Sequence, residues 1–348
     1  MAYTTIDKPS DHFNNKIYTG NASSQSFTGV GFQPDWVWIK RRGSAEGHSI
    51  FDSVRGVQKR IVSNNNEAEL TFTTSLTAFN SDGFTLGGND TVNGSDTYVA
   101  WNWKAGTSFT NDASSTGIGT IDSTGSANDT AGFSICSYTG TGSVATIKHG
   151  LSTVPNVIIT KSRANNENWG FLHSGINTDY WTDYLILNTS ASSGDSAEYY
   201  NDTAPTSSIF TVGTADATND AASMISYIFS ERKGYSKFGS YTGNNNAEGP
   251  FIYTGFKPAF VLIKNTADSA DWTINDTARD PGNVNNLRLF PNTSGAENSG
   301  SNSMDMLSNG FKLRSTDGGN NGSSHVMIYM AFAEAPLVAS NFVPATAR

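Results

Sequence analysis

The chain alternates short hydrophobic segments with polar turns from one end to the other. Aromatic and β-branched residues dominate these segments, and clusters of Gly, Asn, Asp and Ser separate them at the spacing of strands and turns. Residues that favour long helices, such as Glu, Lys and Leu, are scarce. The pattern therefore predicts an all-β protein with few or no helices.

One kind of segment is hydrophobic on both faces of the strand that it predicts. In the stretch 36–39, Trp36 and Trp38 fall on one face and Val37 and Ile39 on the other, because successive side chains alternate. A strand with two apolar faces belongs in the interior. We therefore expect the two tryptophans to be core residues, although a sugar-binding platform is the alternative for tryptophans at this spacing.

Six sequence features recur three times in the same order. They are a Tyr-Thr-Gly turn, a proline-led strand, a polar residue eighteen positions after the proline, a short strand, a strand around a phenylalanine, and a closing aromatic strand. The proline-led strands read QPDWVWIK, VPNVIITK and KPAFVLIK. A period of about 100 residues suits one antiparallel sandwich. We predict three tandem repeats of an antiparallel β-sandwich, jelly-roll or lectin-like.

The recurring features divide the chain into six segments. The second and third repeats follow each other with almost no slack, so they should pack as a rigid pair. The arm before the first repeat either docks on a neighbouring molecule or is a disordered start. The segments are an N-terminal arm (1–13), repeat 1 (14–106), a Gly/Ser/Thr-rich linker or edge segment (107–131), repeat 2 (132–234), repeat 3 (235–337) and a C-terminal tail (338–348).

Charge and cysteine content exclude several classes of function. The formal net charge of −9 disfavours nucleic acid as a partner, because phosphate binding needs clustered Lys and Arg. The single cysteine, Cys136, excludes an internal disulfide and a thiolate metal cluster. No signal-peptide pattern, membrane-length apolar run or cofactor motif is visible. We expect no membrane insertion, no metal and no cofactor.

The polar residues within the repeats predict structure rather than catalysis. Asp52 and Asp276 precede Arg55 and Arg279 by three residues, which indicates a local ion pair that fixes a turn. His173 takes the equivalent place in the second repeat and is expected to be an ordinary polar strand residue. No pair of carboxylates stands out as acid and base, so we expect a protein that is not an enzyme. The lysines that end the proline-led strands are interpreted as strand-end charges rather than catalytic bases: Lys40, Lys161 and Lys264.

Candidate contact loops lie at 64–66, 199–202 and 317–324, and the best candidates for ligand binding lie in the second repeat. Four aromatic residues there have non-aromatic counterparts in the other repeats, and an acidic residue follows them. Sandwich proteins carry function in such loops. Loop or core packing is the alternative for each residue. The candidates are Tyr180, Trp181, Tyr199, Tyr200 and Asp202.

Both ends and the repeat core resemble a known class of proteins. The opening MAYTTIDKPSDHFNNKIYTGN, the strand FQPDWVWIK, the link GYSKFGSYTGN and the ending AFAEAPLVASNFVPATAR resemble virion structural proteins, described as tail or fibre-like, of tailed bacteriophages that infect marine bacteria and cyanobacteria. The resemblance covers essentially the whole chain. Its motifs carry no catalytic role, so no functional residues are transferred from it.

The resemblance implies a non-enzymatic part of the phage particle that assembles in the host cytoplasm. A tail-associated, fibre-like component for host attachment is the first expectation. Such a component would bind other virion proteins, would form a homo-oligomer with a trimer favoured, and would recognise a host surface glycan or an outer-membrane receptor. A head decoration or an adaptor that binds only other virion proteins is the alternative.

Overall fold

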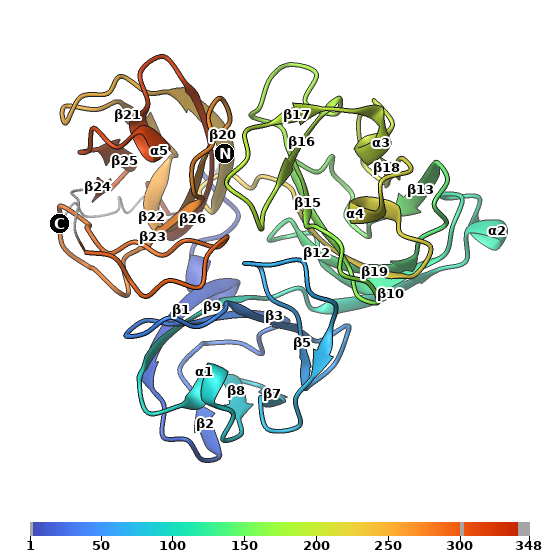
Figure 1. The fold of residues 1–348 in the computed structure, drawn as a ribbon, viewed down its shortest axis with the longest axis horizontal. Helices are drawn as coiled ribbons and strands as arrows, with labels where there is room; N and C mark the ends of the chain where they lie inside the picture. The colour runs from blue at the N-terminus through green and yellow to red at the C-terminus, as the bar shows by residue number, and fades with distance from the viewer. Residues whose placement is uncertain (1–2, 300–302, 340–348) are drawn as a thin grey trace.

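The structure, a computed structural model, describes residues 3–299 and 303–339 and is mostly β. The strands pair antiparallel in several sheets, and none of the helices in the described part of the chain reaches seven residues. The prediction of an all-β protein is confirmed at this level. Figure 1 shows the elements in three groups around a common centre, here called lobe 1 (13–103), lobe 2 (107–229) and lobe 3 (236–336).

Lobe 1 is built from an inner sheet toward the centre of the molecule and a smaller outer sheet. The inner sheet contains, in spatial order, β1 (Phe13–Thr19), β9 (Thr97–Trp103), β3 (Trp36–Arg41) and β4 (Ser49–Asp52). The outer sheet contains β2 (Gln25–Phe27), β8 (Gly83–Leu86) and β7 (Leu76–Asn80). The remaining elements are the pair β5 (Lys59–Arg60) and β6 (Leu70–Thr71) and the turn of helix α1 (Asp90–Asn93).

Lobe 2 contains an extended version of the same inner sheet. Its eight strands are, in spatial order, β10 (Thr107–Asn111), β11 (Ser123–Asn128), β12 (Phe133–Thr139), β19 (Ser223–Phe229), β14 (Val157–Ser162), β15 (Gly170–His173), β16 (Asp183–Ile186) and β17 (Gly194–Asp195). The outer pair is β13 (Ala145–Lys148) and β18 (Ile209–Val212). Short helices are α2 (Ala113–Thr116), α3 (Ala197–Tyr200) and α4 (Asp216–Asn219). The segment 107–131, expected as linker or edge, thus adds β10 and β11 to the sheet edge.

Lobe 3, like lobe 1, contains a four-stranded and a three-stranded sheet. Its inner sheet contains, in spatial order, β20 (Ser236–Thr242), β26 (Val326–Pro336), β22 (Phe256–Asn265) and β23 (Thr273–Asp276). Its outer sheet contains β21 (Phe251–Tyr253), β25 (Gly310–Leu313) and β24 (Met304–Leu307), and a single helical turn, α5 (Gly318–Asn321), precedes β26.

The N-terminal arm packs on its own chain. It contains the short 3-10 helix η1 (Pro9–Asp11), and Ile6 is 3% exposed in the central core. The hydroxyl of Tyr3 donates to the carbonyl of Gly255 at 2.8 Å. The arm therefore joins lobe 1 to lobe 3, while docking of the arm on a neighbouring molecule stays a prediction. Of the C-terminal tail predicted at 338–348, residues 340–348 lie outside the described part.

Hydrophobic residues form one core inside each lobe and a fourth core that all three lobes share. Along β3, Val37 and Ile39 point into the core of lobe 1, while Trp36 and Trp38 point into the shared centre. Both tryptophans are 2% exposed, so their predicted place in the core is confirmed. A strand that buries both faces needs a covering layer on each side, and the inner faces of the three lobes provide it for one another.

Aromatic rings from all three lobes meet in the shared centre. Trp36 of lobe 1 stacks on Tyr227 of lobe 2 with ring centroids 4.6 Å apart. Phe13 of lobe 1 stacks on Phe332 of lobe 3 at 5.1 Å, and Phe229 of lobe 2 meets Phe332 at 5.7 Å. Large aromatic side chains bury the most apolar area per residue, so these contacts stabilise the assembly of lobes strongly.

A ring N–H to carbonyl contact recurs at each boundary between two lobes, here called a seam. The residue directly before β4, before β15 and before β23 carries an aromatic ring, and a nitrogen of this ring contacts a backbone oxygen of another lobe. Such a bond satisfies a buried donor and a buried acceptor together. The three contacts are His48 Nε2 with Phe290 O at 3.1 Å, Trp169 Nε1 with Val62 O at 2.8 Å, and Trp272 Nε1 with Ile186 O at 3.2 Å.

Three buried histidines are held in one neutral form. The Nδ1 atom of His173 accepts the N–H of Gly175 at 2.9 Å, so Nε2 carries the proton and donates to the carbonyl of Tyr329 in lobe 3 at 3.0 Å. His149 and His48 follow the same pattern: Nδ1 accepts an N–H, from Leu151 or Trp38, and Nε2 contacts a backbone carbonyl. His173, expected as an ordinary strand residue, is therefore a contact between lobes 2 and 3.

Burial lowers the pKa of these histidines, because a charged imidazolium loses its hydration in the interior. The pKa falls to about 4 for His149 and for His173, and well below its usual value for His48. A backbone carbonyl opposes the shift only in part in each case. Folding therefore favours the neutral form of all three side chains.

We predict that the protein loses stability as the pH falls from about 6.5 to about 4. In that window the unfolded state binds protons that the folded histidines cannot accept. A shift to about 4, as for His149 and His173, is worth roughly 3 kcal/mol. The free energy of unfolding, measured in urea at several pH values, should fall less steeply in His173→Gln than in the wild type. An identical pH slope in the two proteins would contradict this account.

Among the described residues, none of the helices is long and apolar enough to cross a membrane.

Candidate functional site

The aspartate–arginine pairs expected from the sequence are present, and each also reaches a neighbouring lobe. Asp52 pairs with Arg55, and both side chains are fully buried. The hydroxyl of Tyr227 in lobe 2 donates to Asp52 at 2.7 Å. The second pair, Asp276 with Arg279 at 2.5 Å, accepts the indole N–H of Trp101 in lobe 1 at 3.0 Å. The local pairs are confirmed, and the structure assigns them to the seams.

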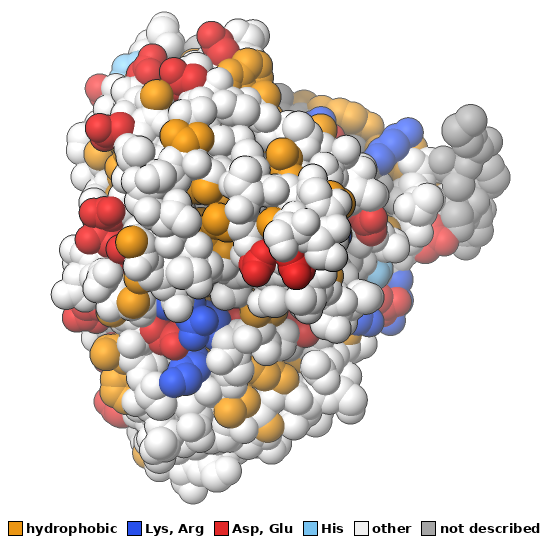
Figure 2. Space-filling view, turned by 90° about the vertical axis from the view of Figure 1, so that its right-hand side faces the viewer, with side chains coloured by type: hydrophobic (Ala, Val, Ile, Leu, Met, Phe, Trp, Pro, Cys, Tyr) orange, Lys and Arg blue, Asp and Glu red, His pale blue; other side chains and the backbone are white. Residues whose placement is uncertain are grey.

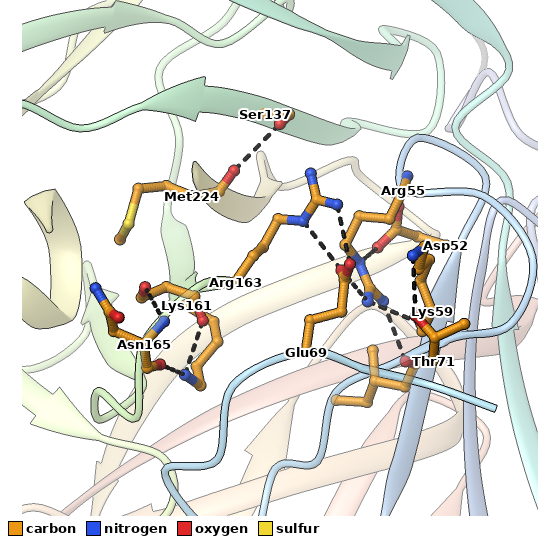
Figure 3. A network of polar contacts seen from close by, with 12 residues as sticks. Asp52, Arg55, Lys59, Glu69, Thr71, Ser137, Lys161, Arg163, Asn165 and Met224 are labelled. Atoms are coloured by element: carbon orange, nitrogen blue, oxygen red, sulfur yellow. Dashed lines mark hydrogen bonds and ion pairs between the residues drawn. The ribbon is translucent and has the colours of Figure 1, made fainter. Parts of the chain in front are cut away.

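A glutamate extends each pair into a network across the seam. Figure 3 shows Glu69 between Arg55 of its own lobe and Arg163 of lobe 2, with nitrogen–oxygen distances of 3.1 Å and 3.0 Å. Burial alone would raise the pKa of the Glu69 carboxyl, but the two guanidinium groups hold it below its usual value. Glu297 bridges Arg279 and Arg42 in the same way between lobes 3 and 1.

The seam between lobes 2 and 3 lacks this network. The backbone contact that accompanies Glu69 and Glu297 is still present there, from the N–H of Ser193 to the carbonyl of Thr266 at 2.9 Å. A serine and a threonine thus stand where the other two seams have charged side chains. The shared core and the imidazole of His173 connect this seam instead.

The interpretation of the three strand-end lysines needs a correction. Lys40, Lys161 and Lys264 are all buried rather than solvated. Each amine donates to backbone carbonyls, and two of them reach another lobe, at Ser294 O (3.2 Å) and at Ser190 O (2.9 Å). Burial lowers the pKa of all three amines to about 8. Their role in the structure is to satisfy buried carbonyls at the ends of the inner sheets.

The predicted aromatic residues of lobe 2 do not form one surface. Tyr180 and Trp181 are half-buried in the loop between β15 and β16 and meet edge to face at 5.2 Å. Tyr199 is half-buried in α3 and stacks on Tyr184 at 3.7 Å with nearly parallel rings. Tyr200 is 1% exposed inside the core of lobe 2.

Asp202 is exposed just beyond the end of α3, with a φ of +46°. The structure thus brings Tyr199 to Tyr184 and Tyr180 to Trp181, and it places Tyr200 out of reach of solvent. Ligand binding by Tyr180, Trp181, Tyr199 and Asp202 stays a prediction.

A pocket lies in lobe 3. It has a volume of about 460 Å³, within the usual range for small-molecule sites. The start of β23 contributes Asp271 and Thr273 to its wall, and the stretch 288–290 contributes Arg288 and Phe290. Asp268 and the first residues of α5, with Asp317 before them, complete the wall.

Arg288 is the most constrained polar side chain of the pocket. It is 6% exposed, pairs with Asp317, and lies over the ring of Phe290 at 5.6 Å. Its Nε atom is buried and has no hydrogen-bond partner within residues 3–299 and 303–339. A buried donor without a partner costs about 1–3 kcal/mol, so it marks a place where an acceptor is missing.

The corresponding places in the other two lobes are occupied by the protein's own rings. Arg288 directly precedes Leu289, which pairs with a strand of the inner sheet at Ile274. The residues in the same position, directly before the paired residue, are Arg60 in lobe 1 and Tyr184 in lobe 2. Tyr184 is covered by the ring of Tyr199, and Arg60 lies over the ring of Phe72 at 5.7 Å. In lobe 3 Arg288 likewise lies over a ring, that of Phe290, and a cavity of about 460 Å³ borders both side chains.

Sequence reasoning named only the loop 317–324 of this pocket, because the other residues of its wall are distant from that loop along the chain. The carboxylates at 268 and 271 are close in sequence, but Arg288 and Asp317 come from two later segments. A difference among the repeats was the useful signal, because lobe 3 has aspartates at 271 and 317. The residues that correspond to Asp271 are Gly47 and Asn168, and those that correspond to Asp317 are Asn89 and Ala215.

We predict that Glu69→Gln lowers the free energy of unfolding by about 2 kcal/mol, because it leaves the buried guanidinium of Arg55 with one carboxylate instead of two. Urea denaturation measures the change. The matched control is Glu67→Gln, which alters an exposed glutamate two residues away and should change stability by less than about 0.5 kcal/mol. Equal effects of the two substitutions would refute a special role for Glu69.

Comparison with known proteins gives a family without an assigned activity. Neither a curated protein nor a solved structure matches the chain. One family model matches residues 8–336, which include all three lobes. The chain belongs to the family described as Domain of unknown function (DUF7483).

Proposed function

We propose that this protein is a non-enzymatic structural component of a tailed phage particle, and that it serves as a tail-associated, fibre-like part in host attachment. The proposal rests on the resemblance of the chain ends and strand motifs to phage virion proteins. It includes three tandem copies of a lectin-like or jelly-roll sandwich at 14–106, 132–234 and 235–337. The structural observation that carries it is the core shared by the three lobes.

A shared core suits a particle component, because it makes three sandwiches one rigid body. Inner strands from every lobe contribute to it, including β3, β14 and β22. Separation of any lobe would expose large aromatic side chains to water, at a cost that rises with the apolar area. A body of this kind presents its loops in fixed positions, which favours recognition of a partner without loss of conformational entropy on binding.

The surface also suits assembly and contact with polysaccharide. Charged residues make up 15% of the chain, and on the side seen in Figure 2 charged and hydrophobic side chains are scattered among backbone and other side chains. Hydroxyl and amide groups form hydrogen bonds with sugars without a large desolvation cost for charge. The proposed partners are other virion proteins, further copies of this chain, with a trimer favoured, and a host surface glycan or outer-membrane receptor.

A head decoration or adaptor is the second candidate, and one observation favours it. Phe251 and Tyr253, on the edge strand β21, are 46% and 53% exposed. The corresponding face of the outer sheet in lobe 1 carries Ser26 next to Thr85, which bond to each other. Exposed aromatic residues on one strand are typical of a protein-binding surface. In this case the chain would bind only other virion proteins.

The location of the protein on intact particles tests the proposal. Gold-labelled antibody raised against the full chain, viewed by electron microscopy, should mark the tail of purified phage. Mass spectrometry of the same particles supplies the control for the presence of the protein. Label over the head would reject host attachment in favour of decoration. A protein absent from the particles by mass spectrometry would reject both candidates.

A further inference from the structure

We propose that the pocket of lobe 3 binds a neutral saccharide through a single sugar ring. The inference gives a ligand class to the proposed host-attachment function and rests on that function for the biological source of the sugar. The site itself is argued from the contacts of Arg288, Phe290 and three aspartates. It differs from the lobe 2 loops that the sequence favoured.

The shape of the pocket indicates a ring. In lobes 1 and 2 the side chain at the position of Arg288 is covered by Phe72 or Tyr199, and in lobe 3 a cavity of about 460 Å³ borders it. Phe290 is half-buried and lines the cavity from below the guanidinium group. A sugar ring has a flat, weakly apolar face, and such a face packs on an aromatic ring or a guanidinium plane as the protein's own rings do in the other lobes.

The polar groups of the pocket match the hydroxyls of a sugar. Asp268 and Asp271 are exposed; Asp268 contacts His325 at 3.3 Å, and Asp271 accepts the amide N–H of Asn292 at 2.6 Å. A carboxylate accepts several hydrogen bonds, so oxygen atoms remain available to ligand hydroxyls. The guanidinium group of Arg288, which has only N–H donors, lines the same pocket and complements these acceptors.

The charge of the pocket selects against acidic ligands. Three carboxylates, of Asp268, Asp271 and Asp317, line it together with one guanidinium group. The pair between Arg288 and Asp317 already uses that positive charge. A phosphate, sulfate or sialic acid would therefore face two uncompensated carboxylates at close range, which is unfavourable. A neutral sugar gains the hydrogen bonds without this repulsion.

The test uses the full chain and a panel of simple sugars. Saturation-transfer difference NMR is recorded with methyl glycosides of glucose, galactose, mannose and N-acetylglucosamine, and with glucuronic acid and N-acetylneuraminic acid as acidic probes. We expect at least one neutral glycoside to bind saturably and both acidic sugars to fail. Absence of binding across the neutral panel, or preference for an acidic sugar, would overturn the proposal.

Two variants locate the binding site. Gly318→Phe places a ring at the pocket wall, where a side chain would meet no protein atom within 4 Å, and it should abolish binding. Asp271→Asn keeps the shape and should weaken affinity about tenfold, the cost of one hydrogen bond to a charged acceptor. The matched control is Gly282→Phe, at an exposed glycine of lobe 3 outside the pocket wall, which should bind as the wild type does.

The outcomes separate this inference from the proposed function. Full binding by Gly318→Phe together with loss in Asp202→Asn would move the site to lobe 2 and reject the pocket. Sugar binding that depends on Asp271 and Gly318, in a protein found on the head of the particle, would support the pocket and reject tail attachment. Label on the tail without any sugar binding would reject the pocket alone.

Discussion

The structure depends on the burial of three inner sheets against one another. Each contains a strand that is apolar on both faces, so that a single two-layer sandwich cannot cover it. The second apolar face of each central strand is covered by the corresponding faces of the central strands in the other two lobes. Every inner sheet is thus a wall of two cores, its own and the shared one, and no lobe is a separate bead.

Polar groups at the seams then decide how the lobes meet. Packing of apolar rings is tolerant of small rotations, whereas a buried N–H without an acceptor costs the full desolvation of that group. Trp169, Trp272 and His48 therefore act as directional contacts, each of which fits only one carbonyl of the next lobe. The Glu69 and Glu297 networks strengthen two of the seams, and Trp272, Lys264 and the neutral His173 connect the third.

Features in which one lobe differs from the other two are the best candidates for function. Buried contacts recur at all three seams because each must satisfy the same backbone groups. The periphery is free to vary, and there lobe 2 has gained two edge strands and a stacked tyrosine pair, whereas lobe 3 has gained exposed aromatics on β21 and a pocket beside Arg288.

The sequence by itself determined the strands, the buried tryptophans and the Asp–Arg pairs, because each follows from alternation or from groups three residues apart. Only the tertiary structure decided which lobes meet and how. Lys40 and Lys264 end their strands as solvated lysines would, yet both are buried, and their amines donate to carbonyls of another lobe. Tyr200 and Tyr199 are neighbours in sequence, but one lies in the core and the other stacks on Tyr184. Contacts between distant segments set these environments, and residue type and spacing do not encode them locally.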